Sequence, residues 1–217
     1  MESRPVKALA TIHTLVFGAM LMSGAVIGQA EAAEYEEDDI RRLVDVVAAY
    51  EGVPADVLYA MALAESGQRI RGNTVPWPWS LNVVGEPRRF DTRDAMFEDL
   101  MAILGEGHLR VDIGLMQINW YWQFERLSSP WRITEPAHNL KVAAQILADQ
   151  YQIHGSWREA VGLYHRPAEG DEHRAAAARY QERVYRFLDS FAKSDSADSP
   201  SNLDACGVFH RCGDSDA

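Results

Sequence analysis

The stretch Val57–Gly67, VLYAMALAESG, decides the fold of this chain. Its first eight residues are apolar on every side of a helix, which is typical of a helix buried in a protein core. Pro54 can start this helix, and Gly67 is a natural place for it to stop. We therefore predict a buried helix that ends in the sequence Glu65, Ser66, Gly67.

Glu65 does not match its apolar neighbours. A carboxylate at this position is partly desolvated, and it lies at the helix end whose dipole disfavours an anion. Both effects raise the pKa of a carboxyl group. A carboxyl that stays protonated near neutral pH is what a glycosidase uses as its general acid. The alternative is an exposed glutamate in the turn that ends the helix.

Helical periodicity continues on both sides of this stretch, and prolines and glycines interrupt it in one place. It predicts further helices over residues 34–51, 92–104, 136–154, 157–164 and 175–191. Between Gly72 and Phe90 prolines and glycines interrupt the helical pattern, and residues 79–84 are expected to form one strand of a small hairpin. The predicted fold class is mainly α (α+β), with one domain over residues 35–191 and a small β-hairpin after Glu65.

Composition and charge bound the class of protein. The 217 residues are 47% hydrophobic and 24% charged, which fits one globular domain with tails. The formal net charge is −11, and the sequence has no block of lysines and arginines. Binding to nucleic acid is therefore not expected, because phosphate binding needs a concentrated basic surface.

The N-terminus has the pattern of an export signal. Arg4 and Lys7 precede an uncharged run over residues 8–30, and small residues follow it. This pattern predicts a secretory signal peptide over residues 1–32, with cleavage after Ala30 or Ala32 and delivery to the periplasm. The alternative is an uncleaved inner-membrane anchor, because the uncharged run is long enough to span a bilayer.

The C-terminal segment differs in composition from the domain. Residues 192–217 are rich in serine and aspartate and are expected to be disordered. This segment contains the only two cysteines, Cys206 and Cys212, for which we predict a local disulfide in an oxidising compartment. A metal site is not expected there, because only His210 accompanies the two cysteines.

The stretch Gly114–Asn119, GLMQIN, is a second candidate for a functional role. It combines a glycine with the amides of Gln117 and Asn119 among apolar residues that include Met116. An amide has both a donor and an acceptor, so it suits sugar hydroxyls and N-acetyl groups. The alternative is the start of an amphipathic helix.

Aromatic residues supply two more candidates. Trp77 and Trp79 place two indoles on a predicted loop, where they could stack on the apolar faces of sugar rings. The alternative for both is core packing. Tyr164 places a hydroxyl at the end of a short apolar helix, and its alternative is a tyrosine at the edge of the core.

In their order and spacing, these motifs resemble the lytic transglycosylase domain, which has a lysozyme-like fold. The resemblance covers roughly residues 40–188. It rests on Glu65–Gly67, on Gly114–Asn119, on the Asn-Leu…Ala-Ala…Ile-Leu helix over 139–147 and on the Ala-x-x-x-Tyr helix over 160–164. The stretches 77–83 and 111–119 look most like the variants that serve conjugative-transfer and pilus-assembly systems.

The resemblance implies roles for the matched positions. Glu65 would be the catalytic acid and then the base, Ser66 and Gln117 would line the site, and Tyr164 would hydrogen-bond to the glutamate or orient it. The predicted substrate-binding residues are Ser66, Trp77, Trp79, Met116, Gln117, Asn119, Tyr164 and His165. The chain departs from the family motif Ala-Tyr-Asn-Ala-Gly, because His165 stands in place of the asparagine. His165 could replace that contact or make the site sensitive to pH.

The implied reaction is cleavage of the β-1,4 bond between N-acetylmuramic acid and N-acetylglucosamine, with closure of a 1,6-anhydro ring. It needs no second carboxylate and no cofactor, and its partners would be glycan strands and components of a conjugation, type IV secretion or pilus apparatus. One alternative is a lysozyme-type muramidase, whose second carboxylate would be Asp112, Asp91 or Glu86. The other alternative is an inactive scaffold that binds peptidoglycan.

Overall fold

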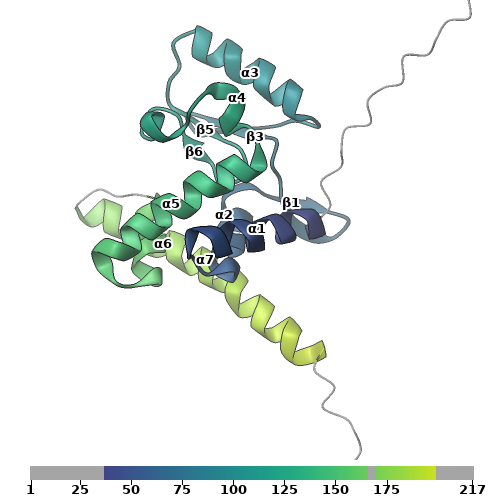
Figure 1. Cartoon of the computed structure of the whole chain (residues 1–217), viewed down its shortest axis with the longest axis vertical. Coiled ribbons are helices and arrows are strands. Elements are labelled where there is room, and N and C mark those ends of the chain that lie inside the picture. The colour runs from purple at the N-terminus through teal and green to yellow at the C-terminus, as the bar shows by residue number, and fades with distance from the viewer. Residues whose placement is uncertain (1–36, 166–169, 199–217) are drawn as a thin grey trace, which may run out of the picture. The chain divides into compact units, whose positions relative to one another are not determined.

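The computed structural model describes residues 37–165 and 170–198 (Figure 1). The helices are α1 (Glu37–Glu51), α2 (Ala55–Ser66), α3 (Arg93–Gly105), the 3-10 helix η1 (Phe124–Arg126), α4 (Pro130–Ile133), α5 (Pro136–His154), α6 (Trp157–His165) and α7 (Asp171–Asp198). The strands are β1 (Gly67–Ile70), β2 (Asn73–Pro76), β3 (Ser80–Val83), β4 (Glu86–Arg89), β5 (Val111–Ile113) and β6 (Ile118–Asn119). The predicted class, mainly α (α+β), is confirmed, and the strands form small antiparallel sheets.

The strands form two small antiparallel sheets. Strands β1 and β2 make a hairpin directly after α2, and the second sheet has the order β4-β3-β5-β6. The predicted hairpin is confirmed as β3–β4, with Ser80 opposite Arg89. The β1–β2 hairpin and strands β5 and β6 were not predicted. The alternative of a helix start at Gly114–Asn119 is wrong, because residues 114–117 form the turn between β5 and β6, and Ile118 and Asn119 form β6.

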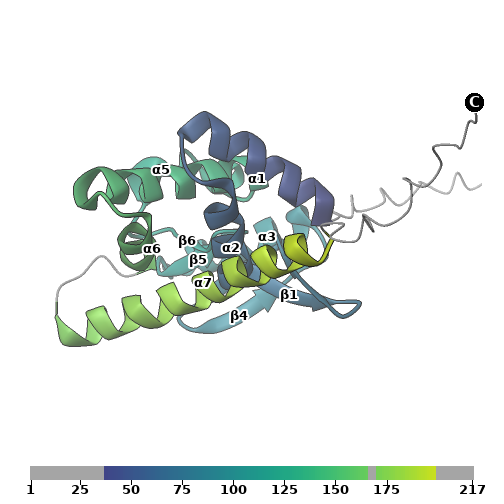
Figure 2. The same ribbon diagram turned by 90° about the horizontal axis from the view of Figure 1, so that it is seen from below.

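Helix α2 is the centre of the core, as its sequence predicts. All of its residues from Val57 to Leu63 are buried, and α1 and α7 pack against it (Figure 2). The second sheet, α3 and α4 lie on the other side of α5 from α1 and α2 (Figure 1). Helix α2 thus packs against α7, which is distant in the sequence, as well as against its sequence neighbours α1, β1 and β2.

Gly67 ends α2 for a reason that differs from the predicted one. Its φ of −49° is not in the left-handed region that a glycine usually supplies at a helix end. A Cβ atom at this position would lie 2.3 Å from the carbonyl oxygen of Leu63. The absence of a side chain therefore lets the chain leave the helix directly into β1.

The predicted ends of the later helices are confirmed at one place and wrong at another. Gly155 ends α5 in the left-handed conformation, with a φ of 70°. In contrast, α7 continues to Asp198, beyond the predicted end at residue 191, so residues 192–198 are helical and do not belong to a disordered tail.

Other predictions fall on parts of the chain that the structure does not describe. The predicted signal peptide, with its alternative of a membrane anchor, and the predicted disulfide between Cys206 and Cys212 lie outside the described residues. Within residues 37–165 and 170–198, no helix has the length and apolar character that a membrane span requires.

Candidate active site

Glu65 lies on the last turn of α2 in surroundings that disfavour its charge. Its side chain keeps part of its surface exposed, while desolvation raises the pKa of its carboxyl from 4.5 to about 7. A hydrogen bond from Tyr180 and the positive charge of Arg183 oppose this rise, and the charge of Asp112 adds to it. Glu65 is therefore a carboxyl that can both hold and release a proton near neutral pH.

Tyr180 and Arg183 bring α7 into the site. The Tyr180 side chain is buried, and its hydroxyl hydrogen-bonds to the Glu65 carboxyl. Arg183 follows one helical turn later, with its guanidinium 5.2 Å from the centre of the Tyr180 ring. Both groups favour the ionised form of Glu65, so they stabilise the carboxylate that remains after a proton has been given away.

Tyr164 supplies a second hydroxyl beside Glu65. Its ring stacks on that of Tyr180 with centroids 6.5 Å apart and an interplanar angle of 18°. Its hydroxyl donates a hydrogen bond to the carbonyl oxygen of Met116 at 2.7 Å. Burial and the charge of Glu65 both raise the pKa of Tyr164, so this hydroxyl stays protonated. Tyr164 thus lies within the field of Glu65, but its hydroxyl donates to the GLMQIN turn and not to the Glu65 carboxyl, which was its predicted partner.

The close approach of α6 and α7 places the two tyrosines together. A Cβ atom at Gly162 would lie 2.5 Å from Nε2 of Gln181, so the glycine leaves room for this side chain. The same Nε2 donates a hydrogen bond to the carbonyl oxygen of Arg158 at 2.8 Å. The contact holds the α6 segment that carries Tyr164 against the α7 segment that carries Tyr180.

A buried asparagine on α5 holds the GLMQIN turn in place. The Asn139 amide nitrogen donates to the carbonyl oxygens of Ile113 at 2.9 Å and Ile133 at 3.1 Å. Its oxygen accepts from the backbone N–H of Met116 at 2.7 Å. Gly114 has a φ of 77°, and a Cβ atom there would lie 2.8 Å from the Asn139 amide nitrogen. The glycine is therefore required both for its backbone conformation and for the space it leaves.

Gln117 lies at the tightest point of this turn. Its φ of 47° is left-handed, which is uncommon for a residue other than glycine and is a frequent feature of functional sites. Its Nε2 donates to the carbonyl oxygen of Gly114 at 2.9 Å and to Oγ of Ser80 at 3.2 Å. These bonds fix the amide plane and leave the amide oxygen as the group that Gln117 can offer to a ligand.

Asp112 and Asn119 face each other across β5 and β6. The Asn119 amide nitrogen donates to Oδ1 of Asp112 at 2.7 Å. Burial raises the pKa of Asp112, and this hydrogen bond lowers it. The charge of Asp112 acts on Glu65, whereas Asp91 and Glu86, the other two predicted candidates for a second carboxylate, are exposed residues absent from the groups that shift the Glu65 pKa. Asp112 is thus the candidate that the fold places beside Glu65.

Two of the predicted substrate-binding residues are internal supports. Ser66 is buried, and its hydroxyl donates to the carbonyl oxygen of Ala62 at 3.2 Å and accepts from the backbone N–H of Trp77 at 3.2 Å. The Met116 side chain is completely buried, and its backbone groups bond to Asn139 and Tyr164. The prediction that these two side chains contact substrate is wrong, because neither is accessible.

The predicted aromatic platform at Trp77 and Trp79 is also wrong. Trp79 is a core residue with 6% of its surface exposed. Trp77 is half-buried against the core, and its indole nitrogen donates to the carbonyl oxygen of Phe90 at 2.9 Å. Core packing, the alternative for this pair, therefore holds for Trp79, whereas a substrate contact of the half-buried Trp77 stays a prediction.

The remaining predicted residue, His165, is the last residue of α6, but its side chain lies outside the described part of the structure. In the described ranges, no group of three or more His, Cys, Asp or Glu side chains is placed to hold a metal ion. Two surface hollows lie elsewhere: one of about 450 Å³ between β4 and α3, and one of about 270 Å³ between α1 and the start of α5. Neither hollow is lined by Glu65.

Tyr180 and Arg183 belong to the site but were not predicted from the sequence. Helical spacing places Tyr180 on the inward face of the last helix, but nothing in the sequence indicates that its partner is Glu65. The sequence shows Asn139 only as part of a motif, because its three hydrogen bonds to two separate segments depend on the fold.

Comparisons with known proteins add no relative. No protein-family model, no curated protein and no solved structure matches this chain.

Proposed function

We propose that this chain is a peptidoglycan lytic transglycosylase with a lysozyme-like fold. The observation that carries the proposal is Glu65, an accessible but desolvated carboxyl with a pKa of about 7 at the end of a buried helix. The order of the motifs along the chain supports the choice of substrate. The hydrogen bonds that Tyr180, Tyr164 and Asn139 make around Glu65 and the GLMQIN turn support the choice of site.

The reaction needs one protein carboxyl. Protonated Glu65 gives its proton to the oxygen that joins C1 of N-acetylmuramic acid to N-acetylglucosamine, and the C1–O bond breaks. The Glu65 carboxylate then takes the proton from the C6 hydroxyl of the same muramic acid, and O6 bonds to C1. The product is a 1,6-anhydro ring, and Glu65 is protonated again. Tyr180 and Arg183 stabilise the carboxylate between the two steps.

A lysozyme-type muramidase is the second candidate, because Asp112 lies close enough for its charge to act on Glu65. In that reaction water attacks C1, and a second carboxylate assists as nucleophile or base. Burial raises the pKa of Asp112, and the hydrogen bond from Asn119 opposes this rise and so favours the ionised form that such a role requires. The two candidates give products that differ by one water.

The experiment is to digest purified peptidoglycan and weigh the muropeptides by mass spectrometry. We expect products that end in 1,6-anhydromuramic acid from the parent protein and none from Glu65→Gln. Asp112→Asn should retain the anhydro product, because transglycosylation does not use it as a nucleophile. Reducing-end products that disappear in Asp112→Asn would instead establish the muramidase. If no product forms although sacculi are bound, the protein is a wall-binding scaffold.

We also propose that the protein acts in the periplasm, on local wall opening for a transfer, secretion or pilus machine. The basic start and uncharged run of residues 4–30 support export, and the motif stretches 77–83 and 111–119 support the assignment to such a machine. Normal assembly of the machine in a strain that carries only the Glu65→Gln protein would remove this part of the proposal.

A further inference from the structure

A group of exposed aromatic side chains follows the GLMQIN turn directly. Tyr121, Trp122 and Phe124 have 49%, 68% and 64% of their surface exposed. We call these three residues the aromatic shelf. Exposed apolar side chains occur singly on most proteins, but three large rings within four consecutive positions are a feature that calls for a binding role.

The shelf is held in a defined shape. The side-chain oxygen of Asn119 accepts hydrogen bonds from the backbone N–H groups of Tyr121 at 3.1 Å and Trp122 at 3.2 Å. The Tyr121 and Trp122 rings meet edge to face with centroids 4.8 Å apart. Phe124 meets the core residue Trp120 in the same manner at 5.6 Å. The rings are therefore positioned before any ligand arrives, which lowers the entropy cost of binding.

The same asparagine connects the shelf to the candidate active site. While its oxygen fixes the shelf backbone, its amide nitrogen holds Asp112, whose charge acts on Glu65. The shelf thus begins at the end of β6, immediately after the turn that carries Gln117. A polymer seated at Glu65 and Gln117 would have the shelf beside it.

The surroundings of the rings are mixed in polarity. The Arg110 guanidinium lies 6.0 Å from the centre of the Tyr121 ring, and both residues are exposed. Gln123 and Glu125 alternate with the rings along the chain. This alternation suits a ligand with apolar faces and polar edges better than it suits a continuous apolar helix or a lipid surface.

We propose that the aromatic shelf binds the sugar rings of the glycan strand next to the bond that is cleaved. The apolar face of a pyranose ring stacks on Trp122 or Phe124, and its hydroxyls remain free to bond to the neighbouring polar groups. Arg110 is placed to attract the carboxylates of the wall polymer. This inference rests on the proposed function, since it extends the substrate beyond Glu65. It assigns the stacking role to the aromatic shelf, since Trp79 lies in the core and Trp77 is half-buried against it.

The test measures binding without turnover. The full chain with Glu65→Gln is sedimented with insoluble peptidoglycan sacculi, and an apparent Kd is obtained from the unbound fraction. We expect Trp122→Ala in this background to weaken binding by about fivefold or more, since each lost stacking contact has about this effect. Trp122→Phe keeps a ring and should restore most of the affinity.

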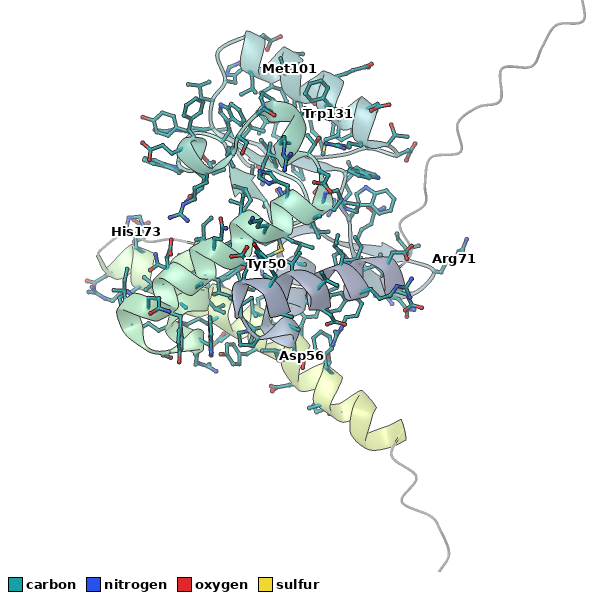
Figure 3. The ribbon with its side chains drawn as sticks, in the orientation of Figure 1. Tyr50, Asp56, Arg71, Met101, Trp131 and His173 are labelled. Atoms are coloured by element: carbon teal, nitrogen blue, oxygen red, sulfur yellow. The ribbon has the colours of Figure 1, made fainter. Side chains whose placement is uncertain are left out.

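The matched control is Tyr50→Ala in the same background. Tyr50 is an aromatic residue on α1 with 79% of its surface exposed (Figure 3). It belongs to a separate surface and should leave the apparent Kd unchanged. Thermal unfolding of every variant shows whether each is folded, which is expected because the replaced rings are exposed.

Three results would overturn the proposal: a parent protein that does not bind sacculi, unchanged binding in both Tyr121→Ala and Trp122→Ala, or an equal loss in Tyr50→Ala. A shelf that serves a membrane would show itself as Trp122-dependent binding to phosphatidylglycerol vesicles with sacculus binding unchanged. Failure of the proposed function gives a different result. If no anhydro products form but sacculus binding still depends on Trp122, the shelf binds glycan and the protein is not a transglycosylase.

Discussion

The end of α2 and the β5–β6 turn are adjacent, but their polar groups differ in how well the fold stabilises them. At the end of α2, burial raises the pKa of Glu65 to about 7, so the native state disfavours the charge of this residue. At the β5–β6 turn, Asn139 of α5 bonds to the Met116 backbone, Gln117 bonds to Gly114 and Ser80, and Asn119 bonds to Asp112. The charge of Glu65 therefore costs free energy in the folded state, whereas the polar groups of the turn have hydrogen-bond partners that hold the turn in place.

This difference shows that the proposed proton transfer and the structural support of the site depend on different segments of the chain. A general acid must be able to lose a proton, so its surroundings cannot be optimised for one protonation state alone. The turn that faces it carries no such requirement and can be fixed completely. Substitutions in each of the two regions should therefore have different effects: those at Glu65 should change turnover and pH dependence, and those at the turn should change stability.

Glu65→Gln should have the largest effect, on turnover. An amide cannot donate the proton that the leaving oxygen requires, so activity on peptidoglycan should fall by about a hundredfold or more. The measurement is the rate of release of soluble muropeptides. Activity within a few fold of the parent would show that Glu65 is not the acid.

Asn139→Ala should have the largest effect on stability. The substitution leaves the backbone N–H of Met116 and the carbonyl oxygens of Ile113 and Ile133 buried without this partner. Each orphaned group costs about 1–3 kcal/mol, so we expect a loss of about 3–5 kcal/mol in the free energy of unfolding. Urea unfolding of this variant and of the exposed-site control Ile153→Ala measures the difference. An equal, small loss in both would contradict the supporting role of the turn.

The pH dependence of stability should separate the parent from Glu65→Gln. Because the folded pKa of Glu65 is about 7 and the unfolded value is 4.5, the native state holds the proton more tightly. The stability that this proton supplies is complete below pH 4.5 and is lost as the pH rises through 7. Relative to the variant, the parent should lose up to about 3 kcal/mol over this interval. Urea unfolding at a series of pH values measures it, and parallel curves would contradict the desolvation of Glu65.

Tyr180→Phe should shift the pH profile of activity and reduce the free energy of unfolding only slightly. The hydroxyl favours the ionised form of Glu65, so its removal should raise the Glu65 pKa and move the alkaline limb of the activity profile to higher pH. The lost hydrogen bond is worth about 1 kcal/mol. Tyr164→Phe is the matched control, because that hydroxyl bonds to the Met116 carbonyl oxygen. Equal profiles in the two variants would contradict the assignment.

Asp112→Asn should have the smallest effect on the pH profile of activity, and its shift should be opposite to that of Tyr180→Phe. The Asp112 charge is the last of the causes that shift the Glu65 pKa, and it raises that pKa. Its removal should lower the Glu65 pKa and move the alkaline limb slightly to lower pH. A complete loss of activity would instead indicate that Asp112 takes part in a muramidase reaction.

The sequence predicts the helices well because their signals are local. The apolar run of α2 and the stop at Gly155 need no knowledge of the rest of the chain. The desolvation of Glu65 was predictable in direction for the same reason. The short strands β5 and β6 were missed, since two or three residues carry too little periodicity to predict a strand.

The parts that could not be predicted depend on contacts between distant segments. Trp79 and Trp122 have the same side chain, yet one is 6% exposed in the core and the other is 68% exposed on the shelf. Tyr180 and Tyr164 both end near Glu65, but only the packed helices decide which hydroxyl bonds to the carboxyl and which to the Met116 backbone.

A titration of the Glu65 carboxyl carbon by NMR measures the desolvation of this residue directly, with Glu65→Gln used to assign the signal. The surroundings of Glu65 predict a pKa of about 7 in the parent protein. A midpoint at the ordinary value of 4.5 would mean that the carboxyl is solvated. In that case the contrast between the end of α2 and the β5–β6 turn, and the general acid that depends on it, would both be wrong.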